Sequence, residues 1–472
     1  MKKQDLQPGK LTLAPYVIKT DLFGPDSEQQ RLDAELGRLI VPEKRSNPQS
    51  ALIELAFLRL KSTARKPGPP LIFLAGGPGV SGTDGLRWEV LAPWFASLRQ
   101  VGDVIALDQR GTGIALPHLD CLETWDLSLD QPGIRAEVLQ QGKEQSRKCA
   151  AFWHDRGVDL SGYTTQESAD DINDLRKALG VERINLYGAS YGSHLALATI
   201  KRHGAHISRA VIAMVEGLDH TIKLPSNIQR HLEHLNELVR ADANLHANIT
   251  DLLELIDTVL HRLEQSPVHV TVNDPQNGQM VNVALSKFDL QLLTASGIGS
   301  RRFISKLPAR YHAMAQGDFS WAASKVLERR REWIGNAMSY VMDCASGVSE
   351  ERSRRVRQEA SGTLLEDLIN FPFPDICDAW GSPDLGPAFR TSFTSHVPAL
   401  FMSGTLDGRT PISNAEEVRV GFPDSHHIIV EGAAHATADI VTAPGVTQAI
   451  IDFLQGSPLS MTHATIPFAF TL

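Results

Sequence analysis

Residues 184–192 read INLYGASYG, an apolar run followed by a glycine, a serine and a second glycine. The first four residues have the composition of a strand, and the apolar spacing at 195–202 predicts a helix. Ser190 therefore stands at a strand-to-helix turn, where the G-x-S-x-G pattern is typical of an exposed nucleophile. Gly188 and Gly192 leave room for such a turn to pack closely. An ordinary glycine turn is the alternative that this short pattern leaves open.

Outward from this turn, short apolar strands alternate with amphipathic helices. Two further runs, 71–75 and 104–107, are apolar on both faces and end in glycine-bearing turns. Such strands are typical of a parallel sheet that helices cover on both sides. The helical spacing of apolar residues at 172–179 indicates βαβ units. Alternation at 32–41 and 51–61 predicts an antiparallel beginning to the same sheet.

The pattern changes after a strand predicted at 210–215. A long, mostly helical stretch follows, with one hairpin predicted around the turn residues 273–278. The strand pattern returns at 397–402 and 427–430, so one sheet is interrupted by a helical cap and then resumed. The predicted organisation is a first part of an α/β core at 1–220, a helical cap insertion at 221–390 and the C-terminal part of the core at 391–472.

A nucleophilic serine needs an imidazole that accepts its proton and a third group that orients the imidazole. Asp407 follows the predicted strand 397–402, and His435 follows the next strand. The chain order serine, aspartate, histidine is the one expected with a G-x-S-x-G nucleophile. Asp424 is the competing acid, but it precedes the last strand and stands at the other end of the sheet. We predict Ser190 as nucleophile, His435 as general base and Asp407 as the orienting acid.

The oxyanion of acyl transfer needs two backbone donors. One comes from the residue after the nucleophile, here Tyr191, and the other from a loop after an earlier strand. Gly77, in the sequence GGPG at 76–79, is predicted as the second donor. The loops that support the site are predicted to contain Gly76, Pro78, Gly79, Gly188 and Gly192.

The sequence DQRGTG at 108–113 follows another apolar strand. No Lys-Ser/Thr pair follows it, so a phosphate-binding loop is not indicated. We predict an Asp108–Arg110 pair and two glycines that shape a loop supporting the active site.

Charge and hydropathy exclude several partners. The 472 residues carry a formal net charge of −9 and the pI is near 6.0, which provides no basic field for nucleic acid. No apolar stretch approaches the ~20 residues that cross a bilayer, and the first residues lack the core of a signal peptide. We expect a small-molecule or short-peptide substrate, no nucleic acid and no membrane, with the oligomeric state open. The chain as given indicates a cytoplasmic protein, and a periplasmic or secreted one if a leader was removed.

The four cysteines form no CxxC pair and have no histidine at zinc-ligand spacing. We therefore expect no metal, and the chemistry predicted above needs no cofactor. In a reducing compartment the cysteines would be buried thiols. In an oxidising one, we predict that Cys121 pairs with Cys149 and that Cys344 pairs with Cys377.

Together, these motifs resemble the prolyl aminopeptidase and tripeptidyl aminopeptidase branch of the α/β hydrolases. The matching segments are 76–79, 108–113, 188–192, 404–411 and 432–435. The resemblance implies an α/β-hydrolase fold, a mostly parallel sheet flanked by helices, with a large helical cap. It also implies a serine hydrolase with Ser190, Asp407 and His435 as its triad, which releases N-terminal residues from short peptides.

Two departures from that family bear on the substrate. Ala75 stands where the family often has a histidine, and Ser346 stands two positions after Cys344, where many tripeptidyl members have an acidic residue. An aminopeptidase must hold a free ammonium, which calls for buried carboxylates, and Glu216 and Asp343 are the candidates. The fold also serves esterases and lactonases, so a carboxylesterase or lactonase is the alternative. A non-catalytic binding protein is the third hypothesis, against which the complete triad argues.

Overall fold

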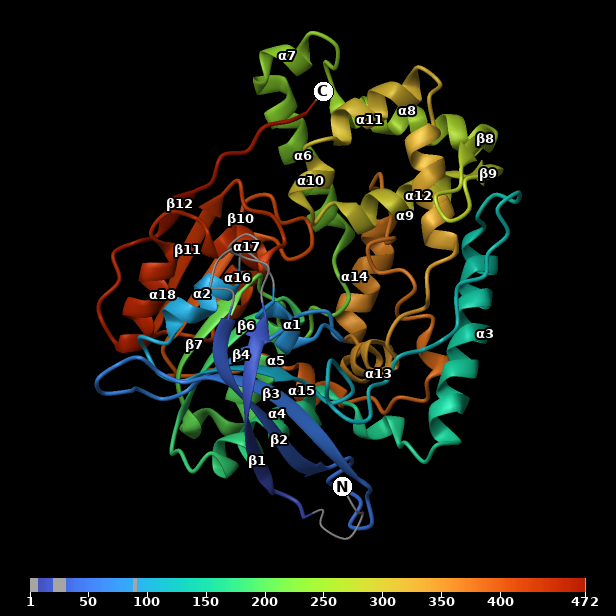
Figure 1. Cartoon of the computed structure of the whole chain (residues 1–472). Helices are drawn as coiled ribbons and strands as arrows, with labels where there is room; N and C mark the ends of the chain where they lie inside the picture. The colour runs from blue at the N-terminus through green and yellow to red at the C-terminus, as the bar shows by residue number, and fades with distance from the viewer. Residues whose placement is uncertain (1–6, 20–30, 88–90, 472) are drawn as a thin grey trace.

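The computed structural model describes residues 7–19, 31–87 and 91–471. A ten-stranded sheet runs through the molecule in the order β1-β2-β3-β5-β4-β6-β7-β10-β11-β12 (Figure 1). The pairs β1/β2, β2/β3 and β3/β5 are antiparallel, and every later pair is parallel. The strands are β1 (Leu11–Lys19), β2 (Arg31–Pro42), β3 (Leu52–Leu60), β4 (Leu71–Leu74), β5 (Val104–Asp108), β6 (Ile184–Ala189), β7 (Ile207–Ala213), β10 (Ala399–Gly404), β11 (Ser425–Glu431) and β12 (His463–Thr465).

The predicted parallel sheet with an antiparallel beginning is confirmed. All residues of β4, β5 and β6 are buried, as expected for strands that helices cover on both faces. The outer strands β1 and β12 were not predicted. Strand β1 lies at the edge of the sheet and pairs with β2 alone, and β12 has only three residues. Neither strand therefore has the pattern of a central strand, which is apolar on both faces.

Each face of the sheet has its own apolar cluster. On one face, the strands pack against α4 (Thr165–Ala178) and α5 (Tyr191–His203). On the other, they pack against α2 (Leu91–Leu98), α17 (Thr437–Val441) and α18 (Val446–Gln455). These layers hold the carboxyl ends of the parallel strands at fixed positions, and the loops that follow β4, β6, β10 and β11 meet there.

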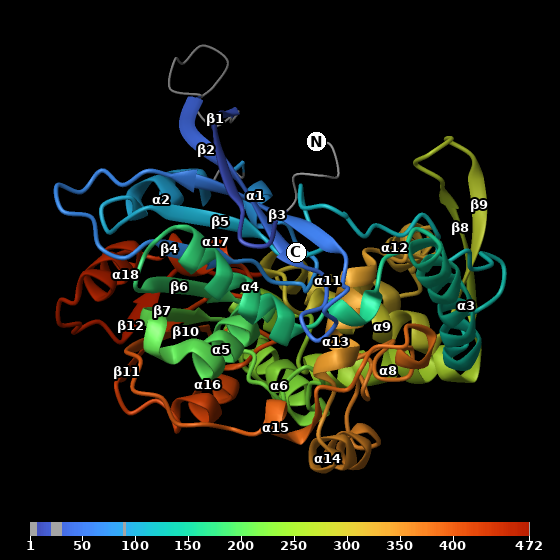
Figure 2. The same ribbon diagram turned by 90° about the horizontal axis from the view of Figure 1, so that it is seen from below.

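The segment between β7 and β10 is largely helical. Many of its helices share a third apolar cluster, separate from the two on the sheet, and lie away from the strands in Figure 1. The predicted hairpin is confirmed: β8 (Val268–Asn273) pairs antiparallel with β9 (Met280–Leu285), and Figure 2 shows it beside α3 (Arg135–His154). The α-helices between β7 and β10 are α6 (Pro225–Ala241), α7 (Ala243–His246), α8 (Leu252–Gln265), α9 (Lys287–Gly297), α10 (Arg301–Ile304), α11 (Leu307–Ala315), α12 (Ser320–Arg330), α13 (Ala337–Ser346), α14 (Glu350–Ala360) and α15 (Gly386–Arg390).

The segment assigned to the cap at 221–390 packs in two different ways. Helices α6, α8, α9, α11 and α12 contribute to the separate cluster. Helix α13 instead inserts Met338, Val341 and Met342 into the cluster on the α4 and α5 face of the sheet. It therefore lies against the core, next to the loops at the carboxyl ends of the strands.

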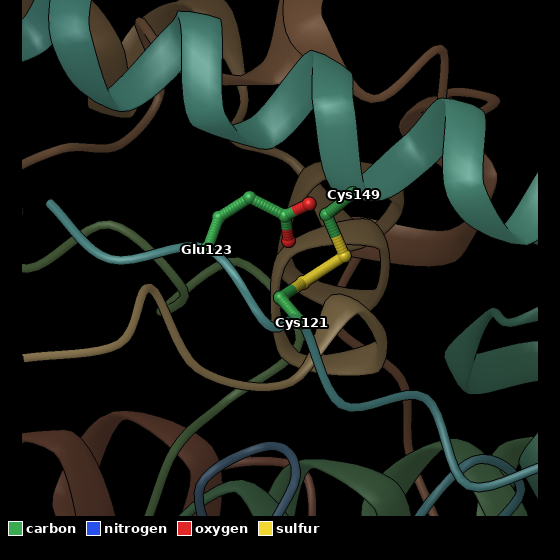
Figure 3. Close-up of side chains that lie close together, drawn as sticks. All are labelled: Cys121, Glu123 and Cys149. Atoms are coloured by element: carbon green, nitrogen blue, oxygen red, sulfur yellow. A yellow bond between two sulfur atoms is a disulfide. The ribbon is translucent and has the colours of Figure 1, made fainter.

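Two disulfide bonds link Cys121 to Cys149 and Cys344 to Cys377, with Cα–Cα distances of 5.4 Å in both. This is the pairing predicted for an oxidising compartment. Figure 3 shows Glu123 close to the first disulfide. A carboxylate oxygen of Glu123 and the two sulfur atoms lie within 4.8 Å of one another, a spacing at which three ligands could bind one metal ion. The two sulfur atoms are bonded to one another, so they do not offer separate thiolate ligands to a metal.

Within the described part of the chain, no helix combines the length and the apolar character that spanning a membrane would require.

Candidate active site

Ser190 occupies a strained turn between β6 and α5. Its φ of 57° and ψ of −127° lie in a region that residues other than glycine rarely adopt. A Cβ on Gly192 would lie 1.9 Å from the carbonyl oxygen of Leu74, and one on Gly188 would lie 2.2 Å from that of Gly192. Both flanking positions therefore require glycine. The strain presents the serine side chain above the end of the sheet.

The side chain of His435 contacts both other members of the predicted triad. Its Nε2 lies 2.8 Å from Ser190 Oγ, and its Nδ1 lies 2.8 Å from Asp407 Oδ2. With the ring proton on Nδ1 facing the carboxylate, Nε2 is free to accept the proton of the serine hydroxyl. The loops after β6, β10 and β11 thus bring the three predicted residues together in the geometry that nucleophilic catalysis needs.

Asp407 is held as an anion. Burial alone raises its pKa, but His435 and Thr410 stabilise the carboxylate, and the net effect lowers the pKa below its ordinary value. The backbone N–H groups of Arg409 and Thr410 donate to Oδ1 over 2.8 and 2.9 Å, and the Thr410 hydroxyl donates to Oδ2 over 2.7 Å. An anion at this position would stabilise a positive charge on the His435 ring.

The competing residues lie elsewhere. The side chain of Asp424 faces solvent beside His396, at 3.1 Å. Another histidine close to His435 in the sequence, His427, lies within β11 and contacts Glu416 and Ser403. Neither Asp424 nor His427 hydrogen-bonds to Ser190, whose hydroxyl lies instead beside His435.

The loop Gly76–Gly79 lies in close contact with Ser190. A Cβ on Gly76 would lie 3.0 Å from the Cβ of Ser190. Gly77 has a φ of 111°, and Gly79 has a φ of 102°, so the loop uses conformations that favour glycine. The loop therefore lies where the second oxyanion donor is predicted. Assignment of Gly77 and Tyr191 as the two donors stays a prediction.

The predicted Asp108–Arg110 pair is wrong, because the two side chains face different elements. Asp108 accepts hydrogen bonds from Ser81, Thr83 and the N–H of Ile114, which stabilise the segment after the oxyanion loop. The Arg110 guanidinium binds Asp171 of α4 in a bidentate contact at 2.7 and 2.8 Å. It also donates to the carbonyl oxygens of Glu43 and Gly162. The loop thus supports the site through two separate networks.

Glu216 and Asp343 are both buried near the triad, and their pKa shifts are opposite. Burial raises the pKa of Glu216, but the charge of Lys223, whose Nζ lies 3.6 Å away, lowers it to a net value below the ordinary one. Burial and the neighbouring Glu216 charge raise the pKa of Asp343 well above its ordinary value. These shifts favour the charged form of Glu216, which lies beside Lys223, and the neutral form of Asp343. Glu216 is close enough to His435 for the two side chains to interact electrostatically.

A cavity of about 360 Å³ opens beside Ser190 and His435. Its walls are mainly apolar and include Phe73, Leu91 and Met214. Among the described residues, the lining contains neither Glu216 nor Asp343. Ser190 therefore opens onto a mainly apolar space whose lining does not include the two carboxyl groups.

A family model described as "alpha/beta hydrolase fold" matches residues 69–439. The chain belongs to this family. The predicted fold class is thereby confirmed, and so is the prediction that the protein is an enzyme.

The proteins that this α/β hydrolase resembles are named for different activities. It is 23% identical over 474 residues to YuaR of Escherichia coli (strain K12), a protein named as a hydrolase. This match covers 93% of the present chain and 89% of YuaR. It is 28% identical over 193 residues to a tripeptidyl aminopeptidase of Streptomyces lividans, covering 38% of this chain and 35% of the peptidase. The match thus spans about a third of the peptidase. Among solved structures, an esterase from Thermogutta terrifontis matches with 15% identity and a TM-score of 0.37, covering 89% of this chain and 98% of the esterase chain.

Sequence reasoning missed the residues of this α/β hydrolase that support the site from a distance. These are Asp171, which binds Arg110, Lys223, which neutralises Glu216, and Ser339, whose hydroxyl donates to the carbonyl oxygen of Pro78 over 2.7 Å. All three are ordinary polar residues on helices or loops. No local pattern distinguishes them from solvated positions, and only their place in the fold shows their partners.

Proposed function

We propose that this α/β hydrolase is a serine hydrolase that works through an acyl-enzyme. Ser190 Oγ attacks the substrate carbonyl while His435 Nε2 takes its proton, and the N–H groups of Gly77 and Tyr191 stabilise the oxyanion. His435 then protonates the leaving group, and a water activated in the same way releases the acyl group. The observation that carries this proposal is the pair of 2.8 Å contacts that His435 makes with Ser190 and Asp407. The chemistry uses protein groups alone.

The proposed substrate class is short peptides with a free N-terminus. Glu216 is a buried anion among the groups around His435, and a buried anion is the group that an N-terminal ammonium needs. Lys223 already balances the charge of Glu216, so a bound ammonium adds a positive charge that Asp343 can balance by losing its proton. The resemblance to aminopeptidases over part of the chain supports the same choice. The helical cap would limit entry to one small chain end.

A carboxylesterase or lactonase is the second candidate. The apolar walls of the cavity at Ser190 favour it, because an apolar acyl or alcohol group would fill that space without a charged partner.

One comparison of substrates separates the two activities. p-Nitroanilides of amino acids and short peptides are assayed with the N-terminus free and N-acetylated. Under the aminopeptidase proposal the blocked forms are rejected, since acetylation removes the ammonium and leaves buried carboxyl groups unpaired. Equal hydrolysis of both forms, or turnover confined to short-chain aryl esters and lactones, would eliminate the peptidase and favour the esterase.

The catalytic mechanism is tested separately with Ser190→Ala and a fluorophosphonate probe. We expect the wild-type protein to be labelled and the variant to lose both labelling and about 10⁴-fold or more of turnover. An unlabelled wild-type protein would support the non-catalytic binding protein instead.

A further inference from the structure

One face of helix α13 is polar and lies against the active-site loops. Asn336, which caps the helix, is followed on this face by Ser339, Asp343 and Ser346. The spacings of three, four and three residues place these side chains one above another along a single stripe. The opposite, apolar side of α13 inserts into the core cluster, and Cys344 links the helix to Cys377. The helix is therefore a fixed support.

The N-terminal half of the stripe holds the oxyanion loop. The Ser339 hydroxyl donates to the carbonyl oxygen of Pro78 over 2.7 Å. A Cβ on Gly79 would lie 2.0 Å from Ser339 Oγ, so loop and helix are in direct contact. One position earlier on the stripe, Asn336 Nδ2 donates to the carbonyl oxygen of Gly111 over 3.0 Å.

The C-terminal half of the stripe holds the first turn of α5. Ser346 Oγ lies 2.9 Å from Thr165 Oγ1, which in turn lies 3.1 Å from the hydroxyl of Tyr191. Ser346 Oγ also lies 3.3 Å from Nε2 of the buried His194. Tyr191 is the residue after the nucleophile, so the same helix contacts the elements that carry both predicted oxyanion donors.

We infer that α13 aligns the two halves of the oxyanion hole and that Ser339 is the positioning residue for the loop half. The inference rests on the acyl-enzyme mechanism proposed above. Gly77 and Gly79 give the loop backbone freedom, and Pro78 has no N–H with which to anchor it. The hydrogen bond from Ser339 fixes the Pro78 carbonyl between the two glycines. This restricts the rotations that would turn the Gly77 N–H away from the oxyanion.

The test is Ser339→Ala, with Ser324→Ala as matched control. The Ser324 hydroxyl, on cap helix α12, donates to the Ser320 carbonyl of its own helix, so this variant removes the same atom without touching the loop. Turnover of p-nitrophenyl butyrate is measured, because this ester does not need an ammonium site. Rates are normalised to the fraction of protein that a fluorophosphonate labels, which removes any loss through misfolding.

We expect Ser339→Ala to lower kcat about 10-fold with KM changed less than about twofold, since the loop acts on the transition state. This is smaller than the ~10²–10³-fold loss that follows deletion of an oxyanion donor. The inhibition constant of phenylboronic acid, which forms a tetrahedral adduct on the serine, should rise by about the same factor as kcat falls. Ser324→Ala should match the wild-type protein in all three measurements.

Three results would overturn the inference: an unchanged kcat in Ser339→Ala, a loss carried by KM alone, or an unchanged boronate affinity. Should the alanine variant give no folded protein, Ser339→Cys keeps a weak donor and is expected to show a smaller loss of kcat, while no loss at all counts against the inference. A wild-type protein that neither hydrolyses the ester nor binds the fluorophosphonate would instead refute the acyl-enzyme mechanism itself.

Discussion

Two buried aspartates, Asp407 in the loop after β10 and Asp343 on α13, differ in their surroundings. Both experience burial that raises the pKa. Asp407 accepts hydrogen bonds from two backbone N–H groups, a hydroxyl and His435, and its net pKa falls. Asp343 Oδ1 has no partner in the described part of the chain, the neighbouring Glu216 is negative, and the pKa of Asp343 rises.

The comparison shows that donors, more than depth, decide the charge of a buried carboxyl group. The loop after β10 supplies donors because its backbone turns around the carboxylate. The middle of a helix cannot do so, since its N–H groups are already paired within the helix. The surroundings therefore favour the anion of Asp407, which faces His435, and the neutral form of Asp343, whose proton a nearby positive charge would help to release.

The largest expected effect comes from Asp407→Asn. An asparagine amide would donate to His435 Nδ1 and favour the tautomer whose Nε2 carries the proton, so the ring could no longer accept the proton of Ser190. We expect kcat/KM for p-nitrophenyl butyrate to fall by about 10⁴-fold with the fold retained. Asp424→Asn is the control and should leave the rate unchanged. The opposite pattern would identify Asp424 as the acid.

A third aspartate, Asp170, extends the comparison to the free energy of unfolding and its dependence on pH. Burial raises the pKa of Asp170, but hydrogen bonds from His203 and Arg202 lower it, to about 2 overall. A folded-state pKa below the unfolded value of 3.8 means that the anion stabilises the fold above about pH 4, and that this contribution disappears as the pH falls through about 2. Asp170→Asn should lower the free energy of unfolding at pH 7 by about 2 kcal/mol.

Urea denaturation of both proteins between pH 7 and pH 2.5 checks this expectation. The difference between variant and wild type should narrow as the pH drops below about 4. Asp155→Asn, at an exposed position, is the control and should show no difference at any pH. A difference for Asp170→Asn that stays constant across the pH range would contradict the ionic explanation.

The smallest effect is expected for Asp343→Asn, because the surroundings favour the neutral form of Asp343 and an amide is also neutral. Unfolding free energy at pH 7 should change by less than about 1 kcal/mol, and kcat for p-nitrophenyl butyrate should stay within about twofold. KM for a free-amine p-nitroanilide should rise by about 10-fold, since an amide cannot lose a proton when the ammonium binds. A large loss of stability would show instead that Asp343 is ionised in the free protein.

Prediction from sequence succeeded where local patterns determine the structure. The strand, turn and helix around Ser190 follow from a nine-residue pattern, and the carboxyl ends of parallel strands had to bring Asp407 and His435 to the same edge. The hairpin β8–β9 followed from its turn residues, and the disulfide partners matched the pairing expected between near neighbours in the sequence.

Prediction failed where partners are distant in the sequence. Arg110 was paired with its neighbour Asp108, yet its partner Asp171 lies on α4. Ser339 contacts a residue 261 positions earlier in the chain, a separation over which no periodicity carries information. The described outer strand β12, with three residues, is too short for its pattern to be recognised.

The interruption of the sheet between β7 and β10 has a consequence for synthesis on the ribosome. When β7 has emerged, its second neighbour in the sheet, which begins at Ala399, has not yet been made. The nascent chain then presents an unpaired edge strand, a surface on which folding intermediates aggregate or bind chaperones. It already carries Ser190 but lacks Asp407 and His435, so the proposed triad cannot assemble until residues as far as His435 have been translated and docked.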